Sequence, residues 1–138
     1  MMSEHGAFRA TEETLRTSNM FIGKWDGYKL SHMLLMRQLA DLTGTPIAEM
    51  SGDTVVHHSR RIYTGTLILN GGINAQHGAR LIAEGAGNLI AFGRDYIANP
   101  DLPERIRRDA ALNEPRPEYF YGSSAMGYTD YPPLSKVS

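Results

Sequence analysis

The stretch Thr66-Leu67-Ile68-Leu69-Asn70-Gly71-Gly72 decides the fold of this chain. It is a short apolar run of strand-forming residues that stops at two glycines, a pattern typical of a strand followed by a tight turn. Asn74 stands where it can cap a helix over the next residues. The apolar face of that helix is predicted to carry Ala75, Ala79, Ile82, Ala83 and Ala86. Residues 88–92 form a second apolar run that ends at Gly93 and Arg94, so the sequence predicts strand, crossover helix and parallel strand.

The ends of these two strands carry residues suited to binding an anion. Gly71, Gly72 and Gly93 have no Cβ, so their backbone N–H groups can approach a phosphate closely. Arg94 adds a planar guanidinium group that matches phosphate geometry. In barrels of alternating strands and helices, the loops after the seventh and eighth strands often bind phosphate. The alternative is that the glycines serve only turns and helix ends, and their spacing does not decide between the two.

Several motifs in the second half of the chain resemble one known family in order and spacing. They are Leu69-Asn70-Gly71-Gly72, Ala91-Phe92-Gly93-Arg94-Asp95-Tyr96-Ile97-Ala98-Asn99-Pro100-Asp101-Leu102, Phe120-Tyr121-Gly122 and Gly127-Tyr128-Thr129-Asp130-Tyr131-Pro132. Residues 63–134 resemble the carboxyl-terminal part of the Old Yellow Enzyme family, and residues 28–62 resemble it less closely. Members of that family are FMN-dependent barrel enzymes that oxidise NAD(P)H and reduce activated alkenes. Some of them reduce nitro compounds or nitrate esters.

The resemblance also implies roles for individual residues. The FMN phosphate would be held by Gly71, Gly72, Gly93 and Arg94. Tyr96 would lie near the flavin and the substrate, Tyr121 would line the substrate pocket, and Arg16 would contact the flavin. The family's flavin-ring contacts, the His-Asn or His-His pair that binds the substrate oxygen, and the proton-donating tyrosine lie on earlier strands and have no counterpart in this sequence. No catalytic residue is therefore predicted.

The length of the chain sets the expected fold class. A complete eight-stranded barrel takes about 250 residues, whereas this chain has 138. We expect an α/β fold, a truncated (β/α)8 TIM barrel made of about the last three strand–helix units and an irregular carboxyl-terminal tail. Residues 1–27 are predicted to be a remnant or a poorly ordered segment, and residues 28–138 a partial FMN-binding barrel domain. An opened barrel leaves strand edges bare, so a homo-oligomer or a complementing chain is expected.

Other segments are predicted from their own patterns. The apolar run 33–36 indicates the strand before the phosphate strands, with a helix as the competing interpretation because Leu and Met favour helices. Thr11 is predicted to cap a short helix, with Thr14 at the position where a capping box prefers Glu. Asp53 is predicted to cap a helix that runs to about Tyr63. Asp101 is predicted to cap a further helix in which Glu104 completes a capping box.

Histidines and arginines outside the motifs have structural alternatives. His57 and His58 are adjacent, so on a helix they point about 100° apart and do not share a metal. Two ligands on one helix require a spacing of four residues, so no metal site is predicted. His32 and Arg37 are candidates for a substrate ligand and a phosphate partner. The alternative, that both are structural, is favoured for isolated residues beside an apolar run.

The composition excludes several classes of partner. Fourteen Lys and Arg residues stand against fifteen Asp and Glu residues, which gives a net charge of −1 and predicts no nucleic-acid partner. The absence of cysteine excludes disulfides and suits a reducing cytoplasm. No apolar run is long enough to cross a bilayer, so no membrane partner is predicted and the expected compartment is the cytoplasm.

Two functions follow from these observations. The first is an FMN-binding oxidoreductase, with NAD(P)H as the electron donor, in which another chain or copy completes the site. The second is a non-catalytic remnant that acts as a self-associating or partner-binding module. The missing catalytic residues and the bare strand edges favour the second, and the phosphate motifs favour the first.

Overall fold

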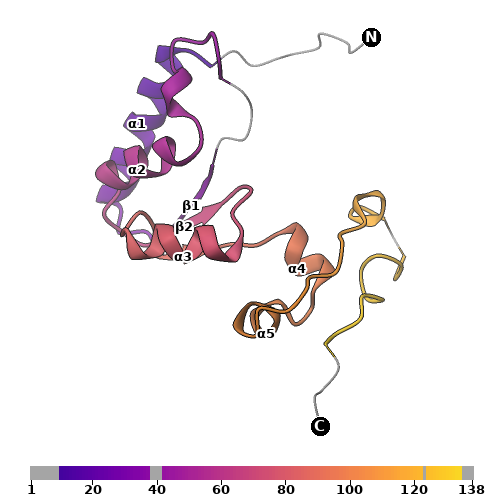
Figure 1. Cartoon of the computed structure of the whole chain (residues 1–138). Coiled ribbons are helices and arrows are strands. Elements are labelled where there is room, and N and C mark those ends of the chain that lie inside the picture. Colours follow the sequence, from indigo (N-terminus) through magenta and orange to yellow (C-terminus); the bar gives the residue numbers. More distant parts are fainter. Residues whose placement is uncertain (1–9, 38–41, 123, 135–138) are drawn as a thin grey trace, which may run out of the picture. The chain divides into compact units, whose positions relative to one another are not determined.

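The computed structural model of this chain describes residues 10–37, 42–122 and 124–134. The described residues belong to two compact units, one that ends at Ala91 and one that begins at Phe92. We call them unit 1 and unit 2 and describe each by itself (Figure 1). The predicted division between residues 27 and 28 stays a prediction.

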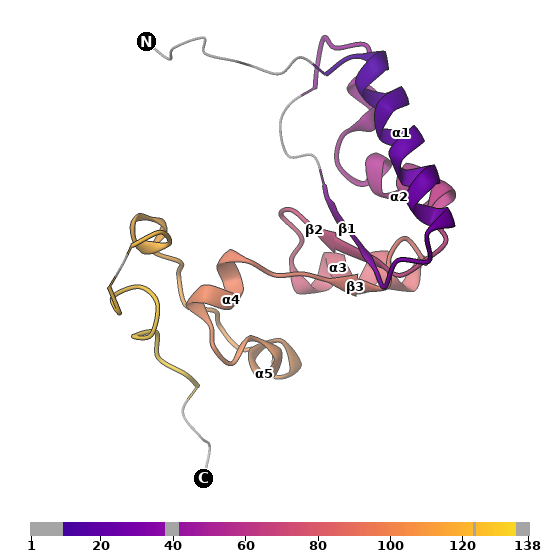
Figure 2. The same ribbon diagram turned by 180° about the vertical axis from the view of Figure 1, so that it is seen from behind.

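Unit 1 is built on a parallel sheet of three strands in the order β1-β2-β3 (Figures 1 and 2). The strands are β1 (Met33–Met36), β2 (Leu67–Asn70) and β3 (Leu89–Ile90). Met33 lies opposite Leu67, and Ile68 lies opposite Leu89. The predicted strand–helix–strand unit is confirmed, and so is the strand interpretation of residues 33–36. The last strand is shorter than the predicted run 88–92.

Helices cover one face of this sheet. They are α1 (Glu12–Gly27), α2 (Asp53–Ile62) and α3 (Ala75–Ala83), with a short 3-10 helix η1 (Ala48–Met50) before α2. The core combines alternate strand residues with one buried residue from each helix: Met33, Leu67 and Leu69 with Ile22, Val56 and Leu81. Burying such apolar side chains contributes about 1.5–3 kcal/mol each relative to exposure. These helices pack against this face of the sheet and do not cover the opposite face.

Helix α3 buries a different face from the predicted one. Its buried residues are Gly78 and Leu81, whereas Ala79, Ile82 and Ala83 are exposed. A Cβ on Gly78 would lie 2.8 Å from the side chain of Ile90, so the missing side chain lets the helix lie close to β3. Of the predicted apolar face, Ala86 is buried in the core, whereas Ala79, Ile82 and Ala83 are wrongly predicted, because the close approach to β3 takes place at the glycine.

Helix α1 is longer and better capped than the sequence indicates. The predicted Thr11–Thr14 capping box is present, and Glu12 and Glu13 stand in the first turn, where acidic side chains favour the helix dipole. The helix then continues for 16 residues and places Ile22 in the core. Residues 12–27 thus form a packed helix, where the sequence predicted a remnant or poorly ordered segment. Residues 1–9 of that segment lie outside the described residues.

Unit 2 contains two short helices and a largely irregular tail. Its elements are α4 (Arg94–Ala98), α5 (Leu102–Arg107) and the 3-10 helix η2 (Pro117–Tyr119). The buried Asn99 joins helix and tail, because its side chain donates to the carbonyl of Asp95 and accepts from the backbone N–H of Asn113. The tail is held by specific polar contacts of this kind, since an irregular backbone must satisfy its own polar groups.

Arg105 is the central side chain of unit 2. It is only 4% exposed, and its guanidinium donates to Asp101, to the carbonyl of Ala111 and to the carbonyl of Pro132 at 2.6–2.7 Å. The predicted capping box at the start of α5 is wrong. Asp101 stands at the N-cap position but makes no side-chain cap bond, because its carboxylate accepts from Arg105 and from the backbone N–H of Leu134. Glu104 pairs instead with Arg107 and Arg108.

No helix in the described residues combines the length and the apolar character that crossing a bilayer requires.

Candidate functional site

The turn after β2 has a backbone that favours glycine. Gly71 has φ of 100° and Gly72 has φ of 61°, both in the left-handed region. A Cβ on Gly71 would lie 2.8 Å from the carbonyl oxygen of Arg37, at the end of β1. The turn is thus pressed against the carboxyl end of the neighbouring strand. A side chain at Gly71 would collide with main chain, which has little room to move.

Arg37, which directly follows β1, stabilises this turn by hydrogen bonds. Its backbone N–H donates to Asn70 at 2.8 Å, its Nε to the carbonyl of Gly71 at 3.0 Å and a terminal nitrogen to the carbonyl of Gly72 at 2.9 Å. The other terminal nitrogen donates to Asp53 at 2.8 Å. The side chain is only 14% exposed. Of the two interpretations of Arg37, the structural one matches these contacts, because the guanidinium is already committed to protein acceptors.

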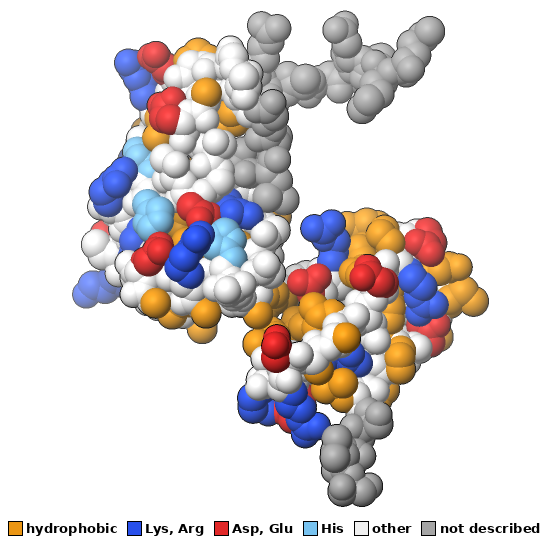
Figure 3. Space-filling model, in the orientation of Figure 1, with side chains coloured by type: hydrophobic (Ala, Val, Ile, Leu, Met, Phe, Trp, Pro, Cys, Tyr) orange, Lys and Arg blue, Asp and Glu red, His pale blue; other side chains and the backbone are white. Residues whose placement is uncertain are grey.

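Asp53 connects Arg37 with α3. Its carboxylate also accepts from His77 at 2.8 Å and from Arg80 at 3.0 Å. Figure 3 shows histidine, acidic and basic side chains gathered over α2 and α3. The predicted capping role of Asp53 is wrong: Gly52 is the N-cap of α2, and Asp53 is the first helical residue. From that position its side chain reaches three partners on other elements.

The environment of Asp53 lowers its pKa. Burial raises the pKa of this carboxyl, but the hydrogen bonds from His77 and Arg37 outweigh the burial and hold the pKa below its usual value. A group whose pKa is lower in the folded state contributes stability above its unfolded pKa, and this contribution is lost as the pH falls through the folded pKa. The carboxylate is therefore a stabilising partner throughout the neutral range.

We expect Asp53→Asn to be destabilising in a pH-dependent way. The difference in unfolding free energy between wild type and variant should be largest above about pH 5 and should shrink below the ordinary aspartate pKa of about 3.9. Urea unfolding of both proteins at a series of pH values measures it. Glu49→Gln, at an exposed position on η1, is the control. A difference that does not change with pH would show that the charge of Asp53 contributes nothing.

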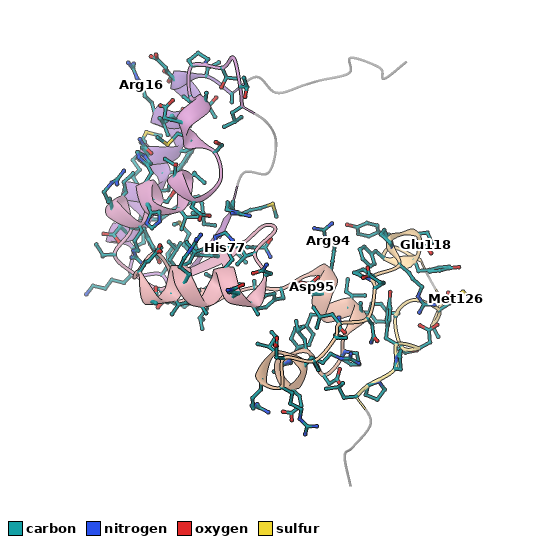
Figure 4. All side chains as sticks on the ribbon, viewed as in Figure 1. Arg16, His77, Arg94, Asp95, Glu118 and Met126 are labelled. Atoms are coloured by element: carbon teal, nitrogen blue, oxygen red, sulfur yellow. The ribbon has the colours of Figure 1, made fainter. Side chains whose placement is uncertain are left out.

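The second predicted glycine–arginine pair lies in unit 2. Gly93 is the N-cap of α4 and Arg94 is its first residue. A Cβ at Gly93 would meet no atom within 4 Å, so the main chain there is open to an approaching group. Arg94 is exposed, and Figure 4 shows its side chain extending away from the ribbon of α4. The main chain of Gly93 and the side chain of Arg94 are therefore both accessible to a phosphate group in solution.

The remaining predicted residues are exposed as well. Tyr96 lies on α4 and is half exposed, whereas Tyr121 in the tail is 99% exposed. Arg16 is exposed on α1, and Figure 4 shows it well apart from His77 of α3 within unit 1. The structure joins Gly71 to Gly72 in one turn and Gly93 to Arg94 at one helix start. The roles implied for these residues stay predictions.

His57 and His58, which were predicted not to share a metal ion, each contact another side chain. His57 lies 3.5 Å from Glu84, and His58 is hydrogen bonded to Asn19 at 2.8 Å. Within residues 10–37, 42–122 and 124–134, the structure contains no group of three side chains that could hold a metal ion. What the sequence missed is the cluster of Arg37, Asp53, His77 and Arg80, for which spacing along the chain offers no signal.

The fold and these strand ends define the class of the protein. Consecutive parallel strands are joined by helices on one face, and a glycine turn follows the central strand. This is the architecture from which (β/α) barrels are assembled. No protein-family model matches the chain.

Comparison with curated proteins gives a consistent group of relatives. The chain is 33% identical over 121 residues to 12-oxophytodienoate reductase 1 of Oryza sativa subsp. japonica, and this alignment covers 84% of this chain and 30% of the relative. It is 42% identical over 80 residues to 12-oxophytodienoate reductase 2 of Arabidopsis thaliana, and this alignment covers 57% of this chain and 21% of the relative. The chain thus spans less than a third of the length of these relatives.

Solved structures agree with this grouping. Morphinone reductase matches with a TM-score of 0.76 and 35% identity over 90% of this chain and 32% of the other. The old yellow enzyme from Trypanosoma cruzi matches with a TM-score of 0.75 and 34% identity over 88% of this chain and 30% of the other. The chain belongs to the Old Yellow Enzyme family, as its motifs predicted.

Proposed function

We propose that this chain contributes the FMN-phosphate-binding part of an NAD(P)H-dependent reductase of Old Yellow Enzyme type. One observation carries the proposal: Gly93 and Arg94 follow β3 along the chain and leave both the main chain and a guanidinium group open to an anion. In this proposal the three strands are the last three of an eight-stranded barrel. The relatives named as reductases supply the reaction class.

The residues at these strand ends fit a phosphate group. An N–H donor or a guanidinium group forms charge-assisted hydrogen bonds with phosphate that contribute about 1.5–3 kcal/mol each. We assign this role to Arg94 and to the main chain of Gly93. In unit 1, considered by itself, the main chain of Gly71 and Gly72 is the second candidate for contacts with an anion, because Arg37 holds their turn in one conformation. A turn that is already ordered loses little entropy when an anion binds.

The described residues fit the flavin ring less well than they fit the phosphate. Tyr96 and Tyr121 are the aromatic candidates near substrate and flavin, and both are substantially exposed in this chain. FMN, when bound, supplies the hydride chemistry, while the protein binds and orients it. The role that we assign to this chain is accordingly binding and orientation, and we assign it no proton-transfer residue. Alkene reduction would need residues from the remainder of a barrel.

The first test of this proposal is phosphate affinity. Arg94→Ala is expected to weaken FMN or inorganic phosphate binding by about 1.5–3 kcal/mol, or roughly 10- to 150-fold in Kd, because one charge-assisted contact is lost. Gly93→Val is expected to weaken binding too, since its side chain would occupy the space over the main chain. Isothermal titration with each ligand measures both effects.

The control is an arginine of the same unit with another role. Arg107 is exposed and pairs with Glu104 on α5, so Arg107→Ala should leave the titration unchanged. Equal affinities for wild type and Arg94→Ala would assign Arg94 a structural role. A purified protein that is colourless, cannot be reconstituted with FMN and does not bind phosphate would contradict the proposed function as a whole.

A further inference from the structure

We propose that Asn70 is a positioning residue for phosphate binding. Its side-chain amide makes the hydrogen bond that a backbone N–H makes in a continuous sheet, and the N–H groups of Gly71 and Gly72 are thereby left to an anion. This role rests on the proposed function and deepens it, because it names the residue that prepares the glycine turn for a phosphate group. All the contacts involved lie in unit 1.

The side chain of Asn70 lies at the carboxyl end of β2, on the face of the sheet that the helices do not cover. Alternate residues of a strand point to opposite faces. In β2, Leu67 and Leu69 are fully buried in the core beneath the helices, whereas Ile68 and Asn70 are partly exposed. In (β/α) barrels the ligand-binding residues come from the carboxyl ends of the strands. Asn70 is therefore at the end of β2 where a ligand is expected.

The amide of Asn70 replaces a backbone donor at the end of the pairing between β2 and β3. The N–H of Ala91 donates to the carbonyl of Leu69 at 2.8 Å. In a regular parallel ladder the carbonyl of Ala91 would then accept from the next free N–H of β2, which belongs to Gly71. Instead it accepts from the side-chain amide of Asn70 at 2.7 Å. The carbonyl is satisfied, and the N–H of Gly71 is not used for it.

The peptide groups of the turn are oriented from the other side by Arg37. Its backbone N–H donates to the carbonyl of Asn70, and its guanidinium donates to the carbonyls of Gly71 and Gly72. The described residues contain no cis peptide bond. In a planar trans peptide the C=O group and the following N–H point in opposite directions. The N–H groups of Gly71 and Gly72 accordingly point away from Arg37.

These two N–H groups are available to a ligand. Within residues 10–37, 42–122 and 124–134, neither of them donates to a protein acceptor. Successive backbone N–H groups in a turn form an arrangement that binds anions such as phosphate. Without the amide of Asn70, the carbonyl of Ala91 would draw the N–H of Gly71, because backbone carbonyls in folded proteins seek a donor. Asn70 thus decides whether this N–H serves the sheet or a ligand.

The experiment titrates the full chain with inorganic phosphate, followed by calorimetry and by NMR of the isotope-labelled protein. In the wild type, the N–H resonances of Gly71 and Gly72 should shift as phosphate binds. Asn70→Ala should raise the Kd for phosphate by about tenfold or more, the equivalent of one charge-assisted hydrogen bond. Without phosphate, hydrogen exchange at the N–H of Gly71 should be slower in Asn70→Ala than in the wild type, because this N–H then donates to Ala91. A merely structural role predicts the opposite, since lower stability speeds exchange.

Asn88 provides the matched control, because it joins the same two strands at their other end. Its side-chain oxygen accepts from the N–H of Leu67 at 2.8 Å and from Arg60 at 3.2 Å. Asn88→Ala removes both hydrogen bonds, so it should lower the stability of unit 1 and leave the Kd for phosphate unchanged. An equal loss of affinity in Asn70→Ala and Asn88→Ala would reduce Asn70 to a structural residue.

The remaining outcomes separate the role of Asn70 from the proposed function. Phosphate binding that Arg94→Ala weakens and Asn70→Ala does not would overturn the role of Asn70 and leave the proposed function standing. Wild-type resonance shifts at Gly93 without shifts at Gly71 and Gly72 would do the same. That measurement needs no variant, so it decides the question even if Asn70→Ala does not fold. A wild-type chain that binds no phosphate would refute the proposed function and, with it, the role of Asn70.

Discussion

Arg37→Ala is expected to lower the free energy of unfolding of unit 1 by about 2–4 kcal/mol. The variant loses three side-chain hydrogen bonds, two to the carbonyls of Gly71 and Gly72 and one to Asp53. The loss is large because, among the described residues, no other guanidinium group donates to the two carbonyls, and because Asp53 loses one of its cations. Urea unfolding followed by circular dichroism measures the change. The same variant should bind phosphate more weakly, since the glycine turn would no longer be held in one conformation.

Two companion variants make this prediction specific. Arg80→Ala removes an exposed arginine from the same carboxylate, and it should cost less than about 1 kcal/mol because solvent screens exposed ion pairs. Arg37→Lys keeps the charge but cannot donate from three nitrogens in a planar fork, so it should behave more like alanine than like arginine. Equal stability of Arg37→Ala and Arg80→Ala would show that the turn does not depend on Arg37.

Arg105→Met is expected to have a similarly large effect on unit 2. The substitution keeps the volume of the side chain but removes three hydrogen-bond donations, two of which satisfy the carbonyls of Ala111 and Pro132. Each lost bond to a buried acceptor costs about 1–1.5 kcal/mol, so the free energy of unfolding of this unit should fall by about 2–4 kcal/mol. Limited proteolysis of the tail, residues 111–134, provides the measurement. Cleavage there should become at least tenfold faster, because Pro132 would no longer be tied to α5.

Arg108→Met is the matched control for this experiment. Arg108 is the C-cap of the same helix and pairs with Glu104, but its side chain is about half exposed. Its replacement should leave the rate of tail cleavage unchanged, since a surface ion pair contributes little. Equal cleavage rates in wild type and Arg105→Met would mean that the tail is held by its aromatic contacts. Those contacts include the guanidinium of Arg116, which lies 4.5 Å from the centre of the Tyr131 ring.

The two arginines also show how far sequence reasoning reached. Arg37 offered two interpretations in the sequence, and Arg105 lies in the helix that was predicted to begin at Asp101. Both are structural, and their acceptors are mostly backbone carbonyls. Carbonyl groups exist at every residue, so no residue type marks those that will accept from a distant guanidinium. The bond from Arg37 to Gly71 spans 34 positions along the chain.

The sequence by itself determined the parallel strand–helix–strand unit, the glycines after the second strand and membership of the Old Yellow Enzyme family. These features depend on local patterns of apolar residues and on short motifs, which can be recognised in the sequence without knowledge of the fold. Only the tertiary structure decided that α3 buries Gly78 and Leu81 instead of the alanine stripe, and that Asp53 binds Arg37 and His77 instead of capping its helix. Close approach of a helix to a strand and competition among polar partners depend on distances between remote segments. Those distances arise only when the chain has folded.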